Sequence, residues 1–292
     1  MNHPVRKKLF PGLTLICLAV LTVLAAAPGS GAKETAETEF FPRGNVFNPL
    51  VADPKEPRFF AGIHRFENDI REDFTGAAVG YGETFGLIRG KPARNRAWQL
   101  SLRGGIFSHF DMDTSSNNLL NSDYTIGLLW SYRYRDFSLR TRAYHQSSHL
   151  GDEYARENPE MLETATGFDY EAVDLLAAWT PDKFRFYGGL HWLVKREPAD
   201  IDRWGYQYGA EYQGTEQIVP YGVFVAGADI KGYQQLDWTP AYSIKAGINF
   251  KNPGRTDHYI QVMAEYYNGF IPYGQYYDYD MKSLGAGIYF GF

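Results

Sequence analysis

From residue 59 onward, apolar and polar side chains alternate with a period of two, and the polar positions repeatedly carry charge. Within residues 122–135, for example, Ile126 and Leu128 share one face, whereas Arg133 lies on the other. Successive side chains of a β-strand point to opposite faces, so this period indicates strands with one apolar and one polar face.

Such strands occur in soluble sheets, with the apolar face inward, and in membrane barrels, with the apolar face outward. Three features favour the membrane barrel. The alternating runs are about 10–14 residues long, against about 5–6 for soluble strands. Aromatic residues, among them 22 Tyr and 20 Phe, gather near the ends of these runs, as an interfacial girdle requires. The polar face also carries Arg, Lys and Glu, which a packed soluble core rarely tolerates.

The predicted fold class is therefore all-β, a closed antiparallel transmembrane β-barrel of about twelve strands, an even number as in single-chain bacterial barrels. Short turns such as 135–136 and 180–183 alternate with longer connections such as 111–121 and 150–166. This is expected for periplasmic turns and external loops if both termini are periplasmic. The predicted strands are 58–66, 75–90, 96–110, 122–135, 136–149, 167–180, 183–195, 202–213, 218–230, 239–251, 257–269 and 281–292.

The first 32 residues have the pattern of a secretory signal peptide. Basic residues at 6–8 precede an apolar run over 9–27, and small residues lead to an expected cleavage site after Ala32. The single cysteine, Cys17, lies in this run, so we expect neither disulfides nor thiolate chemistry in the exported protein.

Two further segments complete the predicted organisation. Residues 33–57, rich in Pro, form an irregular N-terminal periplasmic arm, an internal plug or a flexible linker, and residues 58–292 form the barrel. After the first 30 residues no uncharged apolar run is long enough for a membrane helix, which excludes a helical membrane protein. The net charge of -5 argues against nucleic acid as a partner, because sequence-independent binding needs a basic surface.

The alternating run 281–292 has its last apolar position at Phe292. An alternating strand that closes on Phe resembles the assembly signal of bacterial outer-membrane proteins. Together with the export signal, it predicts location in the bacterial outer membrane and insertion by the barrel assembly machinery through Phe292.

Residues 136–149 carry a candidate catalytic pair, His145 and Ser147, on the face that begins with Phe137 and Leu139. That face is predicted to contact lipid, with His145 roughly 20 Å above the periplasmic turn, near the outer-leaflet interface. Residues two apart on a strand share a face at about 6.7 Å, which lets an imidazole reach a hydroxyl and act as its base.

On the next strand, Glu171 and Asp169 share the parity of the apolar Val173 and Leu175. Either carboxylate can accept the second imidazole N–H and orient the base. A Ser–His–carboxylate set at head-group depth suits a lipid ester, so the expected partners are outer-membrane lipids.

Two other interpretations stay open. Polar residues are ordinary at the rim of a barrel, so His145 and Ser147 are also consistent with no catalytic role. A non-enzymatic barrel is the alternative function, because inward charges can line a small solute pore or close a narrow lumen through salt bridges. The charged residues predicted to face inward are Arg103, Arg133, Arg135, Arg140, Arg142, Arg185, Asp174, Glu211 and Glu265.

Residues 144–148 (YHQSS) resemble the His-x-Ser-Asn-Gly motif of the outer membrane phospholipase A family, a twelve-stranded barrel that works as a calcium-dependent dimer. The resemblance implies His145 as base, Ser147 as nucleophile, calcium as a cofactor and a homodimer. Ser148 and His149 replace the family's Asn-Gly, and a carboxylate replaces the Asn that orients the family's His.

Residues 47–54 (FNPLVADP), followed by Arg58 and Phe59, resemble the start of an uncharacterised, domain-of-unknown-function family of outer-membrane barrel proteins. That resemblance implies a barrel of the same kind and no particular activity.

Overall fold

The computed structural model describes residues 37–68, 73–157, 168–252 and 255–292. Besides its strands, this part of the chain holds a short helix, α2 (Asp152–Glu157), and two 3-10 turns, η1 (Gln234–Leu236) and η2 (Gly274–Tyr276). The strands are β1 (Glu37–Phe40), β2 (Phe59–Asn68), β3 (Phe74–Ala93), β4 (Arg96–Asp111), β5 (Leu119–Tyr134), β6 (Phe137–Leu150), β7 (Phe168–Trp179), β8 (Phe184–Glu197), β9 (Trp204–Val219), β10 (Gly222–Tyr233), β11 (Ala241–Asn252), β12 (Arg255–Phe270) and β13 (Asp280–Gly291).

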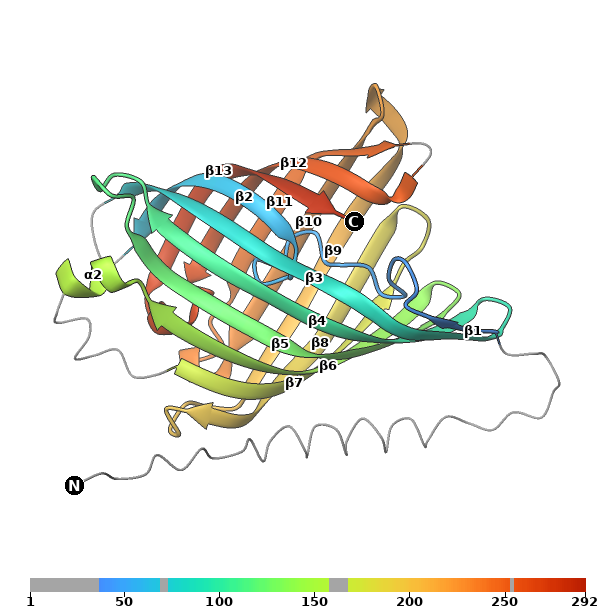
Figure 1. Cartoon of the computed structure of the whole chain (residues 1–292), viewed down its shortest axis with the longest axis horizontal. Helices are drawn as coiled ribbons and strands as arrows, with labels where there is room; N and C mark the ends of the chain where they lie inside the picture. Colours follow the sequence, from blue (N-terminus) through green and yellow to red (C-terminus); the bar gives the residue numbers. More distant parts are fainter. Residues whose placement is uncertain (1–36, 69–72, 158–167, 253–254) are drawn as a thin grey trace. The chain divides into compact units, whose positions relative to one another are not determined.

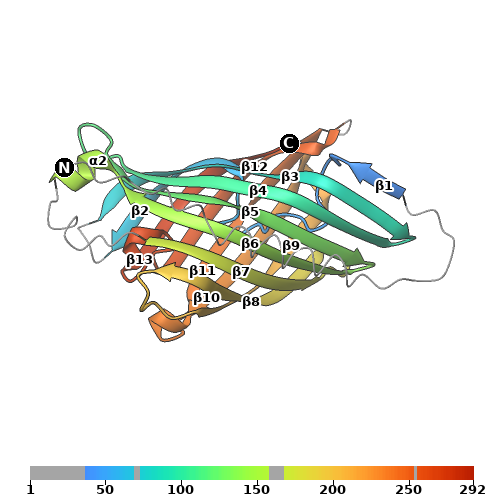
Figure 2. The same ribbon diagram turned by 60° about the horizontal axis from the view of Figure 1, so that its bottom comes forward.

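Strands β2 to β13 form a closed barrel (Figure 1). Each pairs antiparallel with its neighbour in the chain, and β13 pairs with β2, so the ladder has no open seam. Figure 2 shows the strands crossing the wall at a common slant. The predicted fold class, an all-β closed barrel of twelve strands, is confirmed. The predicted signal peptide over residues 1–32 lies outside the described residues.

The barrel carries its apolar side chains outside and its charged ones inside. Leu190 is 58% exposed and Leu284 is 66% exposed, whereas Arg140 and Asp123 are 1% and 0% exposed. A barrel in lipid requires this distribution, because the hydrocarbon replaces the core as the apolar environment. No helix in the described ranges is long and apolar enough to cross a membrane.

The two ends of the barrel differ in their connections. One end, the short-turn end, carries tight turns at 94–95, 135–136 and 220–221, where Asn95 and Tyr221 have φ angles of 64° and 61°. Left-handed residues of this kind allow two strands to reverse within two residues. The opposite end is the long-loop end. Its described connections include 112–118, 198–203, 234–240 and 271–279.

The sequence misplaced one turn by several residues. The turn between the eighth and ninth predicted strands was expected at 214–217, but β9 continues to Val219 and the chain reverses at 220–221. The register between β9 and β10 shifts twice near this turn. Along β9 the chain advances four residues, from Gln217 to Gln213, while the paired stretch of β10 advances only two. A β-bulge accommodates the extra residues inside the strand, so a Gly-containing polar run is not a turn here.

Strand β1 was not predicted, and it covers a free edge. β3 is 20 residues long, and β2 pairs with it only as far as Gly80. Nearer the short-turn end, Glu37–Phe40 pairs with the stretch from Ile88 to Lys91. An uncovered strand edge exposes unpaired backbone groups, so β1 extends the protected ladder.

Residues 41–57, called the lumen segment below, follow an irregular path inside the barrel (Figure 1). It approaches the inner wall closely at Gly82, where an added Cβ would lie 2.7 Å from the Pro57 Cβ. Within the segment, Leu50 and Ala52 are both 0% exposed. Glycine at position 82 therefore leaves the room that Pro57 occupies against β3.

Barrel side chains satisfy the backbone of the lumen segment. The Val51 N–H donates to Glu211 Oε1 at 2.7 Å, and the Ser243 hydroxyl donates to the Ala52 carbonyl at 2.6 Å. Arg185 donates to the carbonyls of Asn48 and Pro49, each at 2.8 Å. Irregular backbone at membrane depth needs such partners, because a polar backbone group that is buried without a hydrogen bond is costly.

Three charged residues of the lumen segment pair with the barrel wall. Glu56 lies between Arg103, at 2.5 Å, and Arg140, at 3.2 Å. Asp53 and Lys55 form ion pairs with charged residues of the wall. These wall partners are Lys231, at 2.6 Å from Asp53, and Asp123, which contacts Lys55. The segment thus balances charges that the wall leaves unpaired.

We expect Glu56→Gln to destabilise the barrel by about 3–5 kcal/mol, because it leaves two buried guanidinium groups without a counter-charge. The measurement is the denaturant midpoint in micelles, with the loss of compact migration on unboiled gels as a second readout. Glu216→Gln is the matched control, since the Glu216 side chain is 91% exposed and lies 3.9 Å from Lys183. Equal midpoints for the two variants would show that Glu56 does not hold the segment.

Candidate functional site

The pairing of β6 with β7 brings the four predicted catalytic residues together on the barrel wall. Glu171 is directly across from His145, and Asp169 is directly across from Ser147. Opposed residues of antiparallel strands point to the same face, with Cα atoms about 4.5–5.5 Å apart. These four residues are called the outer-wall patch below.

The outer-wall patch faces away from the lumen. Leu175 and Trp179, which share the parity of Glu171 on β7, are 50% and 46% exposed. On β6 the intervening residues Gln146 and Ser148 are buried inside the barrel. Because β6 begins at the tight turn 135–136, the patch lies toward the long-loop end.

The strand register places the residue types of a catalytic triad side by side in the patch, but their side chains are not hydrogen-bonded to one another. His145, Ser147 and Asp169 are half-buried, and Glu171 is buried. Within the described ranges, no hydrogen bond joins the side chains of the patch to one another. Lys195 of β8 lies across from Glu171 and adds a cation beside it. Catalytic hydrogen bonds are often long before substrate binds, so the spacing of these side chains is compatible with nucleophilic catalysis.

The inner face of the same part of β6 is closed by hydrogen bonds. The Ser148 hydroxyl donates to Asn121 Oδ1 at 3.0 Å and to the Asp123 carboxylate. Asp123 also accepts the Gly274 N–H at 3.2 Å, and Gln275 Nε2 donates to the Ser148 carbonyl at 2.9 Å. The loop 271–279 is therefore anchored to the inside of the wall behind the outer-wall patch.

The loop 271–279 caps the lumen with tyrosines. Tyr273 lies against His109 with ring centroids 3.6 Å apart, and its ring lies 5.3 Å from Lys55 Nζ. Burial raises the pKa of the Tyr273 phenol, so this side chain is a neutral phenol at neutral pH. Tyr273 and Tyr276 both belong to the buried cluster at this end. The aromatic loop is thus packed into the barrel mouth.

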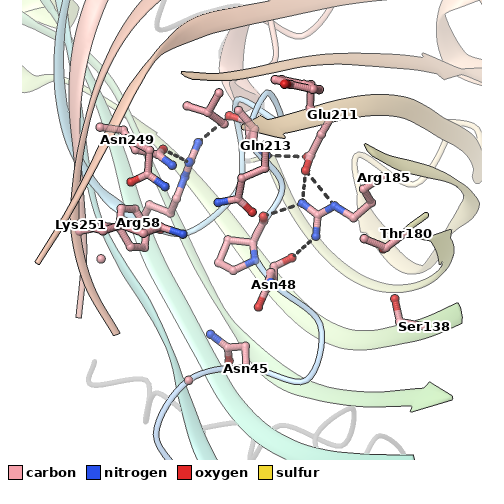
Figure 3. A pocket seen from close by; sticks show the side chains of 18 of the residues that line it. Asn45, Asn48, Arg58, Ser138, Thr180, Arg185, Glu211, Gln213, Asn249 and Lys251 are labelled. Carbon is pink, nitrogen blue, oxygen red and sulfur yellow. Dashed lines mark hydrogen bonds and ion pairs between the residues drawn. The ribbon is translucent and has the colours of Figure 1, made fainter. Parts of the chain in front are cut away.

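At the short-turn end the lumen opens into a cavity of about 450 Å³ beneath the lumen segment (Figure 3). Arg185 projects between Asn48 and Glu211, and its Nε lies 2.8 Å from Glu211 Oε2. Arg58 donates to Gln261 Oε1 at 3.3 Å and to the Val51 carbonyl at 2.8 Å. These two arginines of the cavity are therefore already engaged by the wall and the segment.

The sequence did not reveal the pairing of the lumen segment with the wall. Asp53, Lys55 and Glu56 are three of its four charged residues. The signal was present in the wall, where Arg103 and Arg140 face inward without a carboxylate opposite them. A counter-charge therefore had to come from outside the strands. Among the described residues, no group of three or more His, Cys, Asp or Glu side chains is placed to hold a metal ion.

Several solved barrels resemble the structure. Outer membrane phospholipase A from Escherichia coli matches with a TM-score of 0.51 and 14% identity, over 83% of this chain and 92% of that one. The Salmonella typhi enzyme, a dimer with bound calcium, matches with a TM-score of 0.52 and 12% identity, over 84% and 94%. The transport unit of the autotransporter AIDA-I from Escherichia coli follows at 0.42 and 10%, over 83% and 93%.

At such identities the matches show a shared fold and not a shared activity. They confirm the predicted resemblance to the phospholipase barrel as one of outer-membrane-type fold. No curated protein matches the chain by sequence. The predicted resemblance to an uncharacterised family is confirmed as well, since residues 20–292 match one such family model. The chain belongs to the family described as "Protein of unknown function (DUF1207)".

Proposed function

We propose that the protein is an outer-membrane lipid-ester hydrolase whose active site is the outer-wall patch. The observation that carries the proposal is the β6–β7 register, which sets Glu171 across from His145 and Asp169 across from Ser147 on the lipid-facing side. A nucleophile, a base and a carboxylate at head-group depth meet the ester bond of a lipid where it lies in a bilayer.

Each residue has a distinct role in the proposed reaction. Ser147 Oγ attacks the ester carbonyl while His145 takes its proton, and the imidazolium then returns the proton to the leaving alcohol. Glu171 orients His145, because it is the residue directly opposite, and Asp169 is the substitute if Glu171 pairs with Lys195. Water then releases the acyl group from Ser147 by the same base catalysis.

The proposal includes a location and partners. The long-loop end faces the exterior and the short-turn end faces the periplasm, in keeping with the loop lengths of outer-membrane barrels. Residues 1–32 serve as the export signal, residues 33–57 supply the plug, and Phe292 is read by the barrel assembly machinery. Outer-membrane lipids are the substrates, and calcium and a homodimer are conditions that the assay below must vary.

The contacts inside the lumen favour a closed barrel over the alternative function, a small solute pore. The lumen segment crosses the interior and is bonded to β4, β6, β9, β10 and β11. Further ion pairs of the wall, Arg142–Asp174 and Arg185–Glu211, occupy charges that would otherwise line a water path.

For the hydrolase we expect slow hydrolysis of phospholipid in mixed micelles. The rate is measured with calcium and with EDTA, for the monomer and for a crosslinked dimer. Ser147→Ala should abolish it, and His145→Ala should lower the rate by about 10²–10⁴-fold. Glu171→Gln should cost less, because that carboxylate only orients the base. Sulfonyl fluoride should label Ser147.

The matched control is His149→Ala, on the same face of β6 two residues further along, where the ring contacts Tyr124 at 5.7 Å. Its activity should equal that of the unchanged protein. If Ser147→Ala keeps full activity, or Ser147 stays unlabelled under every condition, the barrel is not this hydrolase.

For the lumen we expect no steady conductance in planar bilayers, because the lumen segment and its ion pairs fill the path. The comparison is with Arg140→Gln and Arg142→Gln, which should remain silent. Steady single-channel currents whose ion selectivity changes in these variants would establish the pore and contradict the closed lumen.

A further inference from the structure

A second cavity, of about 110 Å³, lies inside the barrel at the long-loop end. It is distinct from the cavity of Figure 3, which lies at the opposite end, and from the outer-wall patch, which is on the outside. Three connections frame its mouth, at 198–203, 234–240 and 271–279. A smaller cavity of about 70 Å³ adjoins it and shares Tyr170, His191 and Tyr233 with its lining.

The walls of this cavity are flat and apolar. Phe168 and Tyr277 stack with ring centroids 4.9 Å apart, and Phe168 meets Tyr170 edge-on at 5.6 Å. Leu193 and Ile201 add aliphatic surface. Aromatic faces arranged in this way favour a planar ring as the occupant, through stacked and edge-to-face contacts.

The base of the cavity is polar, and both of its ammonium groups are paired with carboxylates. Lys231 is paired with Asp53 at 2.6 Å, and Lys55 with Asp123. Asp229 accepts hydrogen bonds from the Tyr187 hydroxyl and Gln207 Nε2, both at 2.7 Å. Two ammonium groups thus face three carboxylates, and the additional carboxylate charge, on Asp229, does not favour an anionic ligand.

The base nevertheless keeps donors to spare. An ammonium group has three N–H bonds, and the Lys231 ammonium donates to one acceptor in the described residues, Asp53 Oδ1. The Lys231 side chain is 15% exposed, so its ammonium group is not fully enclosed. An oxygen on a ligand can therefore accept a hydrogen bond here without breaking the ion pair.

We propose that this cavity binds a small neutral compound with a single aromatic ring and one hydroxyl or ether oxygen, of the phenol type. The ring packs against the aromatic cluster of Phe168, Tyr170 and Tyr277, and the oxygen accepts from Lys231. A dry cavity of comparable size binds benzene in another protein, so one ring fits where a larger molecule does not. Concave, mostly apolar sites with few polar groups at a barrel mouth are typical ligand sites. The proposal does not depend on the hydrolase.

The test is binding of 4-fluorophenol to the purified full-length protein in detergent, followed by ¹⁹F NMR line broadening. Fluorobenzene, which lacks the oxygen, and 4-fluorobenzoate, which is anionic, are the comparison probes. We expect saturable binding of 4-fluorophenol, at least tenfold tighter than of either comparison probe. Equal binding of fluorobenzene would overturn the assigned oxygen contact, and tighter binding of 4-fluorobenzoate would overturn the neutral ligand.

Variants separate the cavity from simple partition into detergent. Ala241→Trp fills the cavity and should weaken 4-fluorophenol binding at least tenfold, whereas Ile244→Trp lies outward on the same strand, 48% exposed, and should leave it unchanged. Leu236→Trp fills the mouth from η1, outside the barrel strands, and serves if Ala241→Trp fails to assemble. Non-saturable signals of equal size in all variants would overturn the site.

Discussion

The closed antiparallel ladder is the constraint on which the rest of the structure depends. In hydrocarbon every backbone polar group needs an internal partner, and only a sheet without edges provides one for all strands. Closure then reverses the usual distribution of side chains: the apolar face contacts lipid, and the polar face is enclosed. An enclosed polar face must in turn be filled and balanced in charge, and the lumen segment supplies both volume and charge at that point.

Buried ion pairs of this kind are poor evidence of net stability, since desolvation offsets much of their attraction. What they provide is a single placement for an irregular segment. Glu56 matches two arginines on β4 and β6, and Asp53 matches Lys231 on β10. A shift of the segment by one residue would separate these charges from their partners. The pairs therefore define the position of a chain that has no regular hydrogen-bonding pattern of its own.

The sequence alone specified all twelve barrel strands, because a period of two sustained over long runs fits a β-strand and does not fit a helix. It failed where structure depends on contacts between distant residues. The bulge near Gln217 and the edge strand β1 follow from pairing partners, and neither leaves a periodic signal. For the outer-wall patch, parity placed Glu171 and Asp169 on the correct face, but only the register shows that Glu171 lies opposite His145.

The two faces of β6 are joined through one backbone, and this links the lumen to the outer wall. Ser148 follows Ser147 in the strand and points to the opposite face. Inside the barrel its hydroxyl is hydrogen-bonded to Asp123 and Asn121, and its carbonyl is hydrogen-bonded to Gln275. Those bonds hold the backbone on which Ser147 and His145 project outward. A strand end near a barrel rim is otherwise the part most free to fray. The polar packing of the interior therefore positions the outer-wall residues without touching them, in the way that a second layer of contacts supports a reactive group.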